Sequence, residues 1–240
     1  MLFLNTILDS VLDMVFPARC IVCNRAGLDL CEACLNEAPE AERESAKWIF
    51  PLYDYRHPTI KKSLWLLKYR GKKRLARVFA ENIYSKITEE LSELSLLENF
   101  TAPILIPIPL SQKRYQERGF NQAQLICREL VNISKTKHLT PNPSPYQGEG
   151  QNQILVLENN ILIKPKETEH QARIKDRRER LKNLSGSFAI KNIEKNKDKI
   201  KGKNIILIDD ITTTGATLNE ARKTLRQAGA RKIIAFTVAH

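Results

Sequence analysis

The clearest hydrophobic pattern of the chain lies near its carboxyl end. Ile205–Ile208 is a continuous apolar run rich in β-branched residues, which predicts a short, fully buried parallel strand. The apolar residues that then recur at helical spacing are Leu218, Ala221, Leu225 and Ala228. Gly229 is expected to follow this helix as its C′ residue. A buried strand followed directly by a helix is the unit of a parallel sheet, so the pattern predicts an α/β fold with flanking helices.

Further elements are predicted upstream of this unit. Trp48–Tyr55 has the pattern of a strand, Thr59–Leu67 that of a helix, and Ile106–Leu110 that of a strand ending in a rigid turn. The turn is expected because Pro107 and Pro109 cannot continue a hydrogen-bonded ladder.

The first sixteen residues are apolar at helical spacing, which predicts an amphipathic helix that docks on the protein or on a partner. A signal peptide is the alternative, but the segment lacks a basic start and is interrupted by Asp9 and Asp13. Because no segment reaches the ~18–20 apolar residues of a membrane span, we expect a cytoplasmic protein.

The elements predict a small N-terminal unit over residues 1–47 and one α/β domain over residues 48–240. Residues 135–153 are rich in Pro, Gly, Asn and Gln and cannot form a packed core. They fall between elements of the fold, so we expect a disordered surface insertion there and not a domain boundary.

Charge narrows the class of partner. The chain carries 39 Lys and Arg against 27 Asp and Glu, a formal net charge of +12. This balance suits phosphate-bearing partners such as nucleotides, pyrophosphate or nucleic acid, without choosing between them. One basic cluster lies within residues 164–203, and a second comprises Lys68, Arg70, Lys72, Lys73, Arg74 and Arg77. A solvated helix face or tail is the simpler interpretation of such clusters.

Four of the five cysteines form two neighbouring Cys-x-x-Cys pairs, Cys20 with Cys23 and Cys31 with Cys34. Two such knuckles can present four thiolates tetrahedrally to zinc, and the metal supplies the folding free energy that so short a segment lacks. Four cysteine ligands leave no open position, so the zinc is expected to be structural. Disulfides are disfavoured without an export signal, and a redox-active pair would need a strand-to-helix junction. Cys127 stands in a helical pattern and is expected to be an inert core thiol.

The polar residues after the Ile205–Ile208 run carry the candidate chemistry. Asp209 and Asp210 are expected at the carboxyl end of the strand, where ligands bind in open α/β sheets. They are followed by a loop of Thr212, Thr213, Thr214, Gly215, Ala216 and Thr217. Backbone N–H groups at the start of the next helix favour an anion, and Gly215 allows close approach. Threonine hydroxyls can donate to phosphate oxygens, while the carboxylates suit a sugar diol or a magnesium-bound sugar. Together these groups describe a site for ribose 5-phosphate.

Three alternative kinds of site compete with a phosphate loop in this segment. A hydrophobic strand ending in Asp also occurs in ATPases, but the sequence contains no Gly-x-x-x-x-Gly-Lys-Ser/Thr loop. A phospho-acceptor aspartate would leave the threonine-rich run without a role. Helix capping would need one hydroxyl residue and not three. The phosphate loop is therefore the preferred interpretation.

The residues named so far, taken together, resemble a known family. Ile205–Thr217 is similar to the signature with which type I phosphoribosyltransferases bind phosphoribosyl pyrophosphate (PRPP). Together with the cysteine knuckles, the chain resembles the ComF family, which includes the GntX proteins and is similar to predicted amidophosphoribosyltransferases. Other residues that carry the resemblance are Lys68-Tyr69-Arg70-Gly71, Ile106–Leu110, Arg114, Arg118, Gly119, Phe120, Asn121, Gln122, Thr168, Gln171, Arg180, Asn183, Gly186 and Phe188.

The resemblance implies a type I phosphoribosyltransferase-like parallel sheet flanked by helices and preceded by a four-cysteine zinc element. It places the ribose hydroxyls at Asp209 and Asp210. It implies a pyrophosphate loop comprising Pro107, Ile108, Pro109, Arg114 and Arg118, and a flexible covering loop with Gln171, Arg178 and Arg180. A solvated helix start is an equally good interpretation of the two arginines at 114 and 118.

The resemblance also implies a function: a phosphoribosyltransferase that binds PRPP with magnesium, linked to DNA uptake in natural competence or to nucleotide salvage. Two alternatives on the same fold are a non-catalytic nucleotide sensor and a competence factor that binds single-stranded DNA through its basic clusters. Competence or helicase proteins would then be partners. The aromatic residues near these clusters are Trp65, Tyr69, Tyr115 and Phe120, which gives the DNA alternative modest support.

Overall fold

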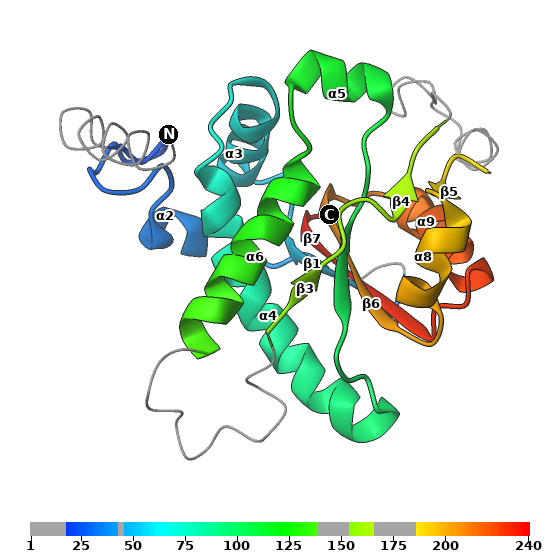
Figure 1. Ribbon diagram of the computed structural model, residues 1–240. Coiled ribbons are helices and arrows are strands. Elements are labelled where there is room, and N and C mark those ends of the chain that lie inside the picture. Colours follow the sequence, from blue (N-terminus) through cyan, green and yellow to red (C-terminus); the bar gives the residue numbers. More distant parts are fainter. Residues whose placement is uncertain (1–17, 43–45, 139–153, 166–185) are drawn as a thin grey trace.

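The computed structural model describes residues 18–42, 46–138, 154–165 and 186–240. Within them, five strands form one parallel sheet in the order β1-β7-β6-β2-β3 (Figure 1). The strands span Ile49–Tyr53 (β1), Ile104–Pro107 (β2), Val156–Leu157 (β3), Asn204–Ile211 (β6) and Lys232–Ala239 (β7). The parallel α/β sheet predicted from the sequence is therefore confirmed.

The strand register positions the acid pair. Pro107 at the end of β2 is level with Ile208 of β6, and β6 continues past this level to Ile211. Asp209 and Asp210 therefore lie inside the strand, which the sequence predicted to end before them. Because successive side chains of a strand point to opposite faces, the two carboxylates leave β6 on different sides of the sheet.

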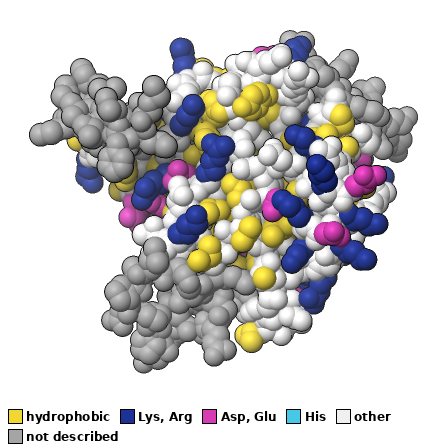
Figure 2. All heavy atoms as spheres, viewed as in Figure 1, with side chains coloured by type: hydrophobic (Ala, Val, Ile, Leu, Met, Phe, Trp, Pro, Cys, Tyr) yellow, Lys and Arg dark blue, Asp and Glu magenta, His cyan; other side chains and the backbone are white. Residues whose placement is uncertain are grey.

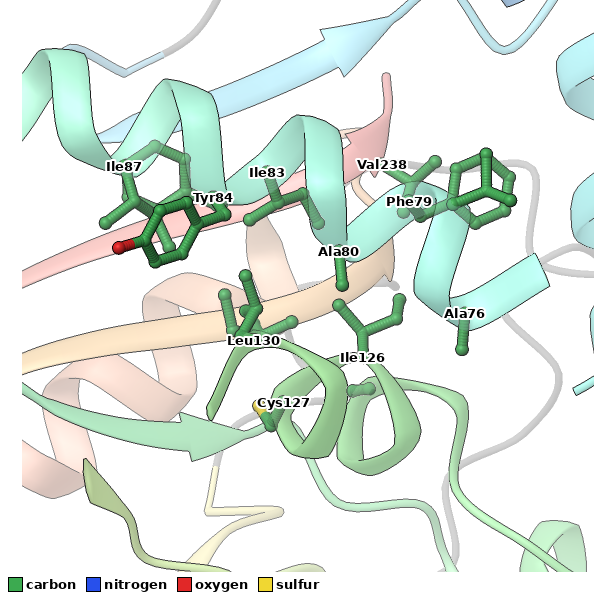
Figure 3. Packing of buried hydrophobic residues seen from close by; sticks show 14 of the residues in the cluster. Ala76, Phe79, Ala80, Ile83, Tyr84, Ile87, Ile126, Cys127, Leu130 and Val238 are labelled. Atoms are coloured by element: carbon green, nitrogen blue, oxygen red, sulfur yellow. The ribbon is translucent and has the colours of Figure 1, made fainter. Parts of the chain in front are cut away.

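Helices cover both faces of the sheet. On one face lie α4 (Leu75–Glu98) and α6 (Gln122–His138), with α3 (Pro58–Tyr69) beside α4. Figure 3 shows Phe79 and Ile83 of α4 packed together with Ile126 and Leu130 of α6. Cys127 is buried in the same cluster, and burial raises the pKa of its thiol well above the ordinary value, as expected for an inert core thiol.

The opposite face is covered by α8 (Ile193–Ile200) and α9 (Ala216–Gln227). Ile205 and Leu207 of β6 pack there against Leu218 and Leu225 of α9, all of them fully buried. The alternate residues of β6 enter the core on the α4 side. Burial on both faces explains why the strand is apolar without interruption.

Short elements complete the described part of the chain. They are α2 (Glu32–Asn36), α5 (Gln112–Arg118) and an antiparallel pair formed by β4 (Leu162–Ile163) and β5 (Ala189–Ile190). The predicted strand at 48–55 and helix at 59–67 correspond to β1 and α3. Residues 135–138, predicted to belong to the insertion, are part of α6, which continues to residue 138.

Two predicted segments, the N-terminal helix and residues 139–153 of the insertion, lie outside the described residues. Among the helices that the structure describes, none has the length and apolar character needed to cross a membrane.

The four-cysteine segment packs on α3. Leu30 and Leu35 are fully buried in the same hydrophobic cluster as Ile60 and Leu64 of α3. Lys62 of α3 donates a hydrogen bond from Nζ to a backbone carbonyl of the first cysteine knuckle, at 2.7 Å. The segment is thus joined to the α/β domain by a shared core and not only by the chain.

Candidate functional site

A cavity of about 340 Å³ opens at the carboxyl ends of β2 and β6. The residues predicted for the site that line it are Ile108, Pro109, Arg114, Arg118, Asp209, Asp210, Thr213 and Thr217. Pro107 does not line the cavity, because it is buried in β2. The covering-loop residues Gln171, Arg178 and Arg180 lie outside the described part of the chain. Most of the predicted site is therefore brought together in one place.

The acid pair is bound into a network of charges. Asp210 Oδ2 lies 3.0 Å from Nζ of Lys68 on α3, and both side chains are largely buried. The backbone N–H of Asp210 donates to Oδ1 of Asp209 at 2.8 Å. Burial and the neighbouring Asp210 carboxylate raise the pKa of Asp209 to about 7, although Lys68 and Lys164 oppose the shift. Asp209 is thus held in a site that disfavours its charge until a partner for that charge arrives.

Lys164 faces the acid pair from another segment, directly after β4. Burial and the neighbouring Arg114 lower the pKa of its ammonium group to about 8, while Asp209 acts in the opposite direction. Its Nζ also lies 5.5 Å from the ring centroid of Phe188. A cation that loses hydration in this way gains most from an anionic ligand.

Replacing Asp209 with asparagine is expected to stabilise the protein at pH 8. The folded state raises the pKa of Asp209 above its unfolded value, so the wild-type protein loses stability as pH rises from about 4 to about 7. The asparagine carries no charge, and its oxygen can still accept from the Asp210 amide. We expect a melting temperature at least about 3 °C above that of the wild type at pH 8. The difference in melting temperature should disappear near pH 4.5. A variant less stable than the wild type at pH 8 would contradict a raised pKa of Asp209.

The loop after β6 forms a second, smaller hollow of about 30 Å³ that shares Asp209, Ile211, Thr213 and Thr217 with the main cavity. Its other lining residues include Thr212, Thr214, Gly215 and Ala216. All six loop residues predicted to hold phosphate therefore surround one small space. The hollow lies at the start of the twelve-residue helix α9, where the helix dipole favours an anion.

Gly215 gives the loop its path. It has φ +69, a left-handed conformation that non-glycine residues seldom adopt, and it directly precedes α9. A Cβ atom at this position would lie 3.1 Å from Cδ1 of Ile49 in β1, closer than ordinary packing allows. The Ala216 N–H donates to Oγ1 of Thr214 at 3.4 Å, while the backbone N–H of buried Thr212 is bonded to the carbonyl of Ala239. The loop is thus fixed at both ends around the hollow.

The opposite wall is built by the segment from β2 to α6. The Ile108 N–H donates to the carbonyl of Ile208, which fixes the turn to β6. Asn121 then holds the start of α6, because Nδ2 donates to the Ile108 carbonyl at 2.9 Å and Oδ1 accepts from the Ala123 N–H at 3.0 Å. These bonds give Asn121 a structural role, which sequence reasoning had left undecided.

Arg118 and Gln122 form a polar pair on this wall. Arg118 Nη1 donates to Oε1 of Gln122 at 2.9 Å, and its Nη2 donates to the hydroxyl of Tyr69 at 3.4 Å. The guanidinium also stacks over the Tyr69 ring, with Cζ 5.2 Å from the centroid. Within the described residues, Nε2 of the fully buried Gln122 has no hydrogen-bond partner. A donor left unsatisfied beside a cavity is suited to a ligand oxygen.

Lys68, Tyr69, Lys164 and Gln122 are site residues to which sequence reasoning gave no role in the cavity. The Lys68-Tyr69-Arg70-Gly71 segment contributed to the family resemblance. Its two cations were otherwise interpreted only as members of a basic cluster. Lys164 was likewise one of many basic residues in its stretch. Nothing local distinguishes a cation that enters a cavity from one that faces solvent.

The four cysteines form a separate centre. The sulfur atoms of Cys20, Cys23, Cys31 and Cys34 all lie within 4.8 Å of one another, and Cys23 and Cys31 are 3.6 Å apart. A tetrahedral zinc ion with Zn–S bonds of about 2.3 Å places its sulfur ligands about 3.8 Å apart, so the donor set and its spacing fit zinc. The four clustered cysteines are those that the sequence predicted to bind zinc.

The protonation chemistry of the cluster agrees with a metal site. Burial of Cys20 would raise the pKa of its thiol, but the backbone N–H groups of Cys31, Cys23 and Val22 outweigh burial and lower the pKa to about 6. Cys34, by contrast, hydrogen-bonds to Cys31 and is buried, and its pKa is raised to about 12. Four thiols so close together cannot all ionise without a cation between them, which is the charge that zinc supplies.

A parallel sheet whose central strand carries paired carboxylates before a hydroxyl-rich loop defines a phosphoribosyltransferase domain, and the phosphoribosyl transferase domain family matches residues 165–240. Together with the four-cysteine cluster and the similarity to competence proteins, this match supports a ComF family protein with a phosphoribosyltransferase domain.

Among its relatives, Competence protein ComFC of Bacillus subtilis is 32% identical over 189 residues, which cover 78% of this chain. Competence protein F of Haemophilus influenzae is 34% identical over 131 residues, or 54% of this chain. The chain spans only 62% and 46% of the lengths of these two relatives. A hypoxanthine phosphoribosyltransferase of Staphylococcus aureus aligns in structure over 67% of this chain and 62% of its own, at 12% identity and a TM-score of 0.30. That score is too low to add to the assignment.

Proposed function

We propose that the cavity binds PRPP with magnesium and that the protein is a phosphoribosyltransferase. The observation that carries the proposal is the meeting of Asp209, Asp210, Thr213 and Thr217 on one cavity whose other walls carry cations, with the rest of the Thr213–Thr217 loop around the adjoining small hollow. PRPP has three polar parts, a diol, a 5-phosphate and a pyrophosphate. Each of them has a chemically matched group here.

The ribose and its phosphate would occupy the β6 side of the cavity. The carboxylates of Asp209 and Asp210 accept hydrogen bonds from the sugar hydroxyls. The 5-phosphate lies at the start of α9, where loop N–H groups and the hydroxyls of Thr213 and Thr217 donate to it. Gly215 permits the left-handed conformation, φ +69, with which this loop enters α9.

The pyrophosphate would face Arg114, Arg118 and Lys164. As the bond between the anomeric carbon and pyrophosphate breaks, the sugar gains oxocarbenium character and the leaving group gains negative charge. Cations already held in a cavity stabilise that charge without reorganising, which lowers the barrier. Magnesium belongs to the bound PRPP and shares this neutralisation. The acceptor nucleophile then forms its bond to the same carbon.

The cellular role that we propose is in DNA uptake or nucleotide salvage. Two relatives carry the name competence protein, and both extend beyond the part that this chain matches. The basic surface supports a partner rich in phosphate: Lys and Arg side chains are spread over the face shown in Figure 2.

Calorimetric titration of magnesium–PRPP into the wild-type protein and an Asp209→Asn, Asp210→Asn variant tests the proposal. We expect micromolar binding by the wild type and at least about tenfold weaker binding by the variant, because charge-assisted hydrogen bonds to the diol are lost. Asp198→Asn is the matched control, since it removes an exposed carboxylate on α8 and should bind like the wild type. Absence of binding by the wild type would contradict the proposal.

A second function, binding of single-stranded DNA, has one specific observation in its favour. Aromatic rings and cations alternate beside the cavity mouth, with Arg70 5.3 Å from the Trp65 centroid and Lys73 5.0 Å from that of Phe120. Trp65 and Tyr69 are about half exposed; Arg70 and Arg118 each cover one side of these rings, and the remaining exposed ring surface is available to bases. Titration of a labelled oligothymidylate in increasing salt distinguishes the two functions. Binding of the oligonucleotide by protein that does not bind PRPP would favour the DNA-binding function.

A further inference from the structure

Asp29 lies between the two cysteine knuckles, yet it is not among the four clustered ligands. Its carboxylate is 1% exposed and accepts from Nζ of Lys72 at 3.0 Å and from Nε of Arg74 at 3.2 Å. The two cations are about half exposed. Two cations from another segment compensate the charge of this buried carboxylate. The ion pairs hold that segment in place, because loss of the carboxylate or of the cations leaves an uncompensated charge.

The segment that Asp29 holds is the end of α3. Lys72 and Arg74 belong to the short connection from α3 to α4, and the N–H groups of Arg70 and Lys72 both donate to the carbonyl of Leu66. The connection is therefore bonded back to the last turn of the helix. A displacement of Lys72 moves that turn.

The same turn carries one wall of the cavity. Lys68 is the partner of Asp210 at 3.0 Å, and Tyr69 accepts from Arg118 and lies beneath its guanidinium. On its other side α3 packs on the cysteine segment through the buried residues Leu30, Leu35 and Ile60. Helix α3 is thus a shared wall between the metal centre and the cavity.

These contacts lead to an inference that rests on the proposed function: we infer that Asp29 is a positioning residue for the PRPP site. By holding Lys72 and Arg74, Asp29 fixes the last turn of α3 and with it the Nζ of Lys68 beside Asp210. The folded cysteine element thereby sets the affinity of a cavity to which it contributes no lining residue. This role is distinct from supplying metal ligands.

The test compares Asp29→Asn with the wild type in the full chain. The variant keeps the shape of the side chain and all four cysteines, so zinc content and far-ultraviolet circular dichroism should not change. We expect hydrogen–deuterium exchange of residues 66–74 to rise and magnesium–PRPP affinity to fall roughly five- to tenfold. Glu81→Gln is the matched control, because it removes the carboxylate of an exposed pair with Arg77 on the neighbouring helix. It should change neither quantity.

A Lys68→Met background separates positioning from general damage. If Asp29 acts through Lys68, adding Asp29→Asn to Lys68→Met should lower affinity by less than about twofold. An equal loss of affinity in both backgrounds would overturn the inference, as would unchanged exchange in residues 66–74. Failure of the proposed function is seen separately, as absence of PRPP binding by the wild-type protein. The exchange measurement would then still decide whether Asp29 holds the end of α3.

Discussion

Replacing Gly215 with valine is expected to weaken magnesium–PRPP binding by about 100-fold or more. Valine is strained at φ +69, and its Cβ would lie 3.1 Å from Ile49 in the buried core. The loop must move to relieve both conflicts, and its N–H groups then no longer converge on the 5-phosphate. Loss of two charge-assisted hydrogen bonds, at about 1.5–3 kcal/mol each, corresponds to this change in affinity. Calorimetric titration measures it directly.

Gly202 provides the control for backbone strain alone. It has φ +72, and a Cβ there would meet no atom within 4 Å. Gly202→Val should therefore lose stability from the strained backbone while retaining wild-type affinity for magnesium–PRPP. Equal affinity losses in the two variants would show that the Gly215 effect arises from general destabilisation, and would remove the loop from the proposed phosphate site.

Disrupting the predicted zinc site at the four cysteines is expected to cause the largest loss of stability. Structural zinc contributes an apparent ~10–16 kcal/mol to folding of isolated zinc modules, and here the module also covers α3. We expect Cys31→Ser, Cys34→Ser, or prolonged exposure to a strong chelator, to lower the melting temperature by about 10 °C or more. Differential scanning calorimetry and zinc analysis by mass spectrometry provide the two measurements.

Cys127→Ala is the control for the loss of a thiol. Cys127 is buried in the core beneath α4, so its replacement should cost stability through a small cavity while one zinc per chain is retained. A wild-type protein that holds no zinc and whose mass shows two disulfides would contradict the metal assignment. Such a result would instead favour the disulfide alternative that the spacing of the four cysteines also permits.

Much of the proposed phosphosugar site could be predicted because its signal is local. The apolar run of β6, the two aspartates and the threonine-rich loop are contiguous, and each constrains the next through the geometry of a strand–loop–helix unit. The length of β6 could not be predicted in the same way. Two acidic residues resemble the end of a strand, yet pairing between Ile211 and Ala239 carries β6 past them. That pairing depends on the position of strand β7, which cannot be inferred from the two aspartates.

The other walls of the cavity depend on contacts between distant parts of the chain. Lys68 reaches Asp210 only because α3 docks beside α4, and Lys164 acts on Asp209 only because the segment after β4 lines the same cavity. Both lysines lie in basic stretches, where solvation is the simpler interpretation of a charge. Two of the six residues of that basic cluster, Lys72 and Arg74, have a structural role, since they hold Asp29. Composition alone cannot show which residues of such a cluster face solvent, which face a ligand and which form structural contacts.

The strand order has a kinetic consequence. β7 lies between β1 and β6, and β1 has no other strand partner in the described sheet, so Ile49 and Ala235 must find each other across nearly the whole α/β domain. Such non-local pairing raises contact order, and the entropy of closing a long loop must be overcome before the contact is formed. We therefore expect β1 to remain an unpaired apolar segment until late in folding. We expect slow refolding and a transient tendency to aggregate, which low protein concentration would relieve.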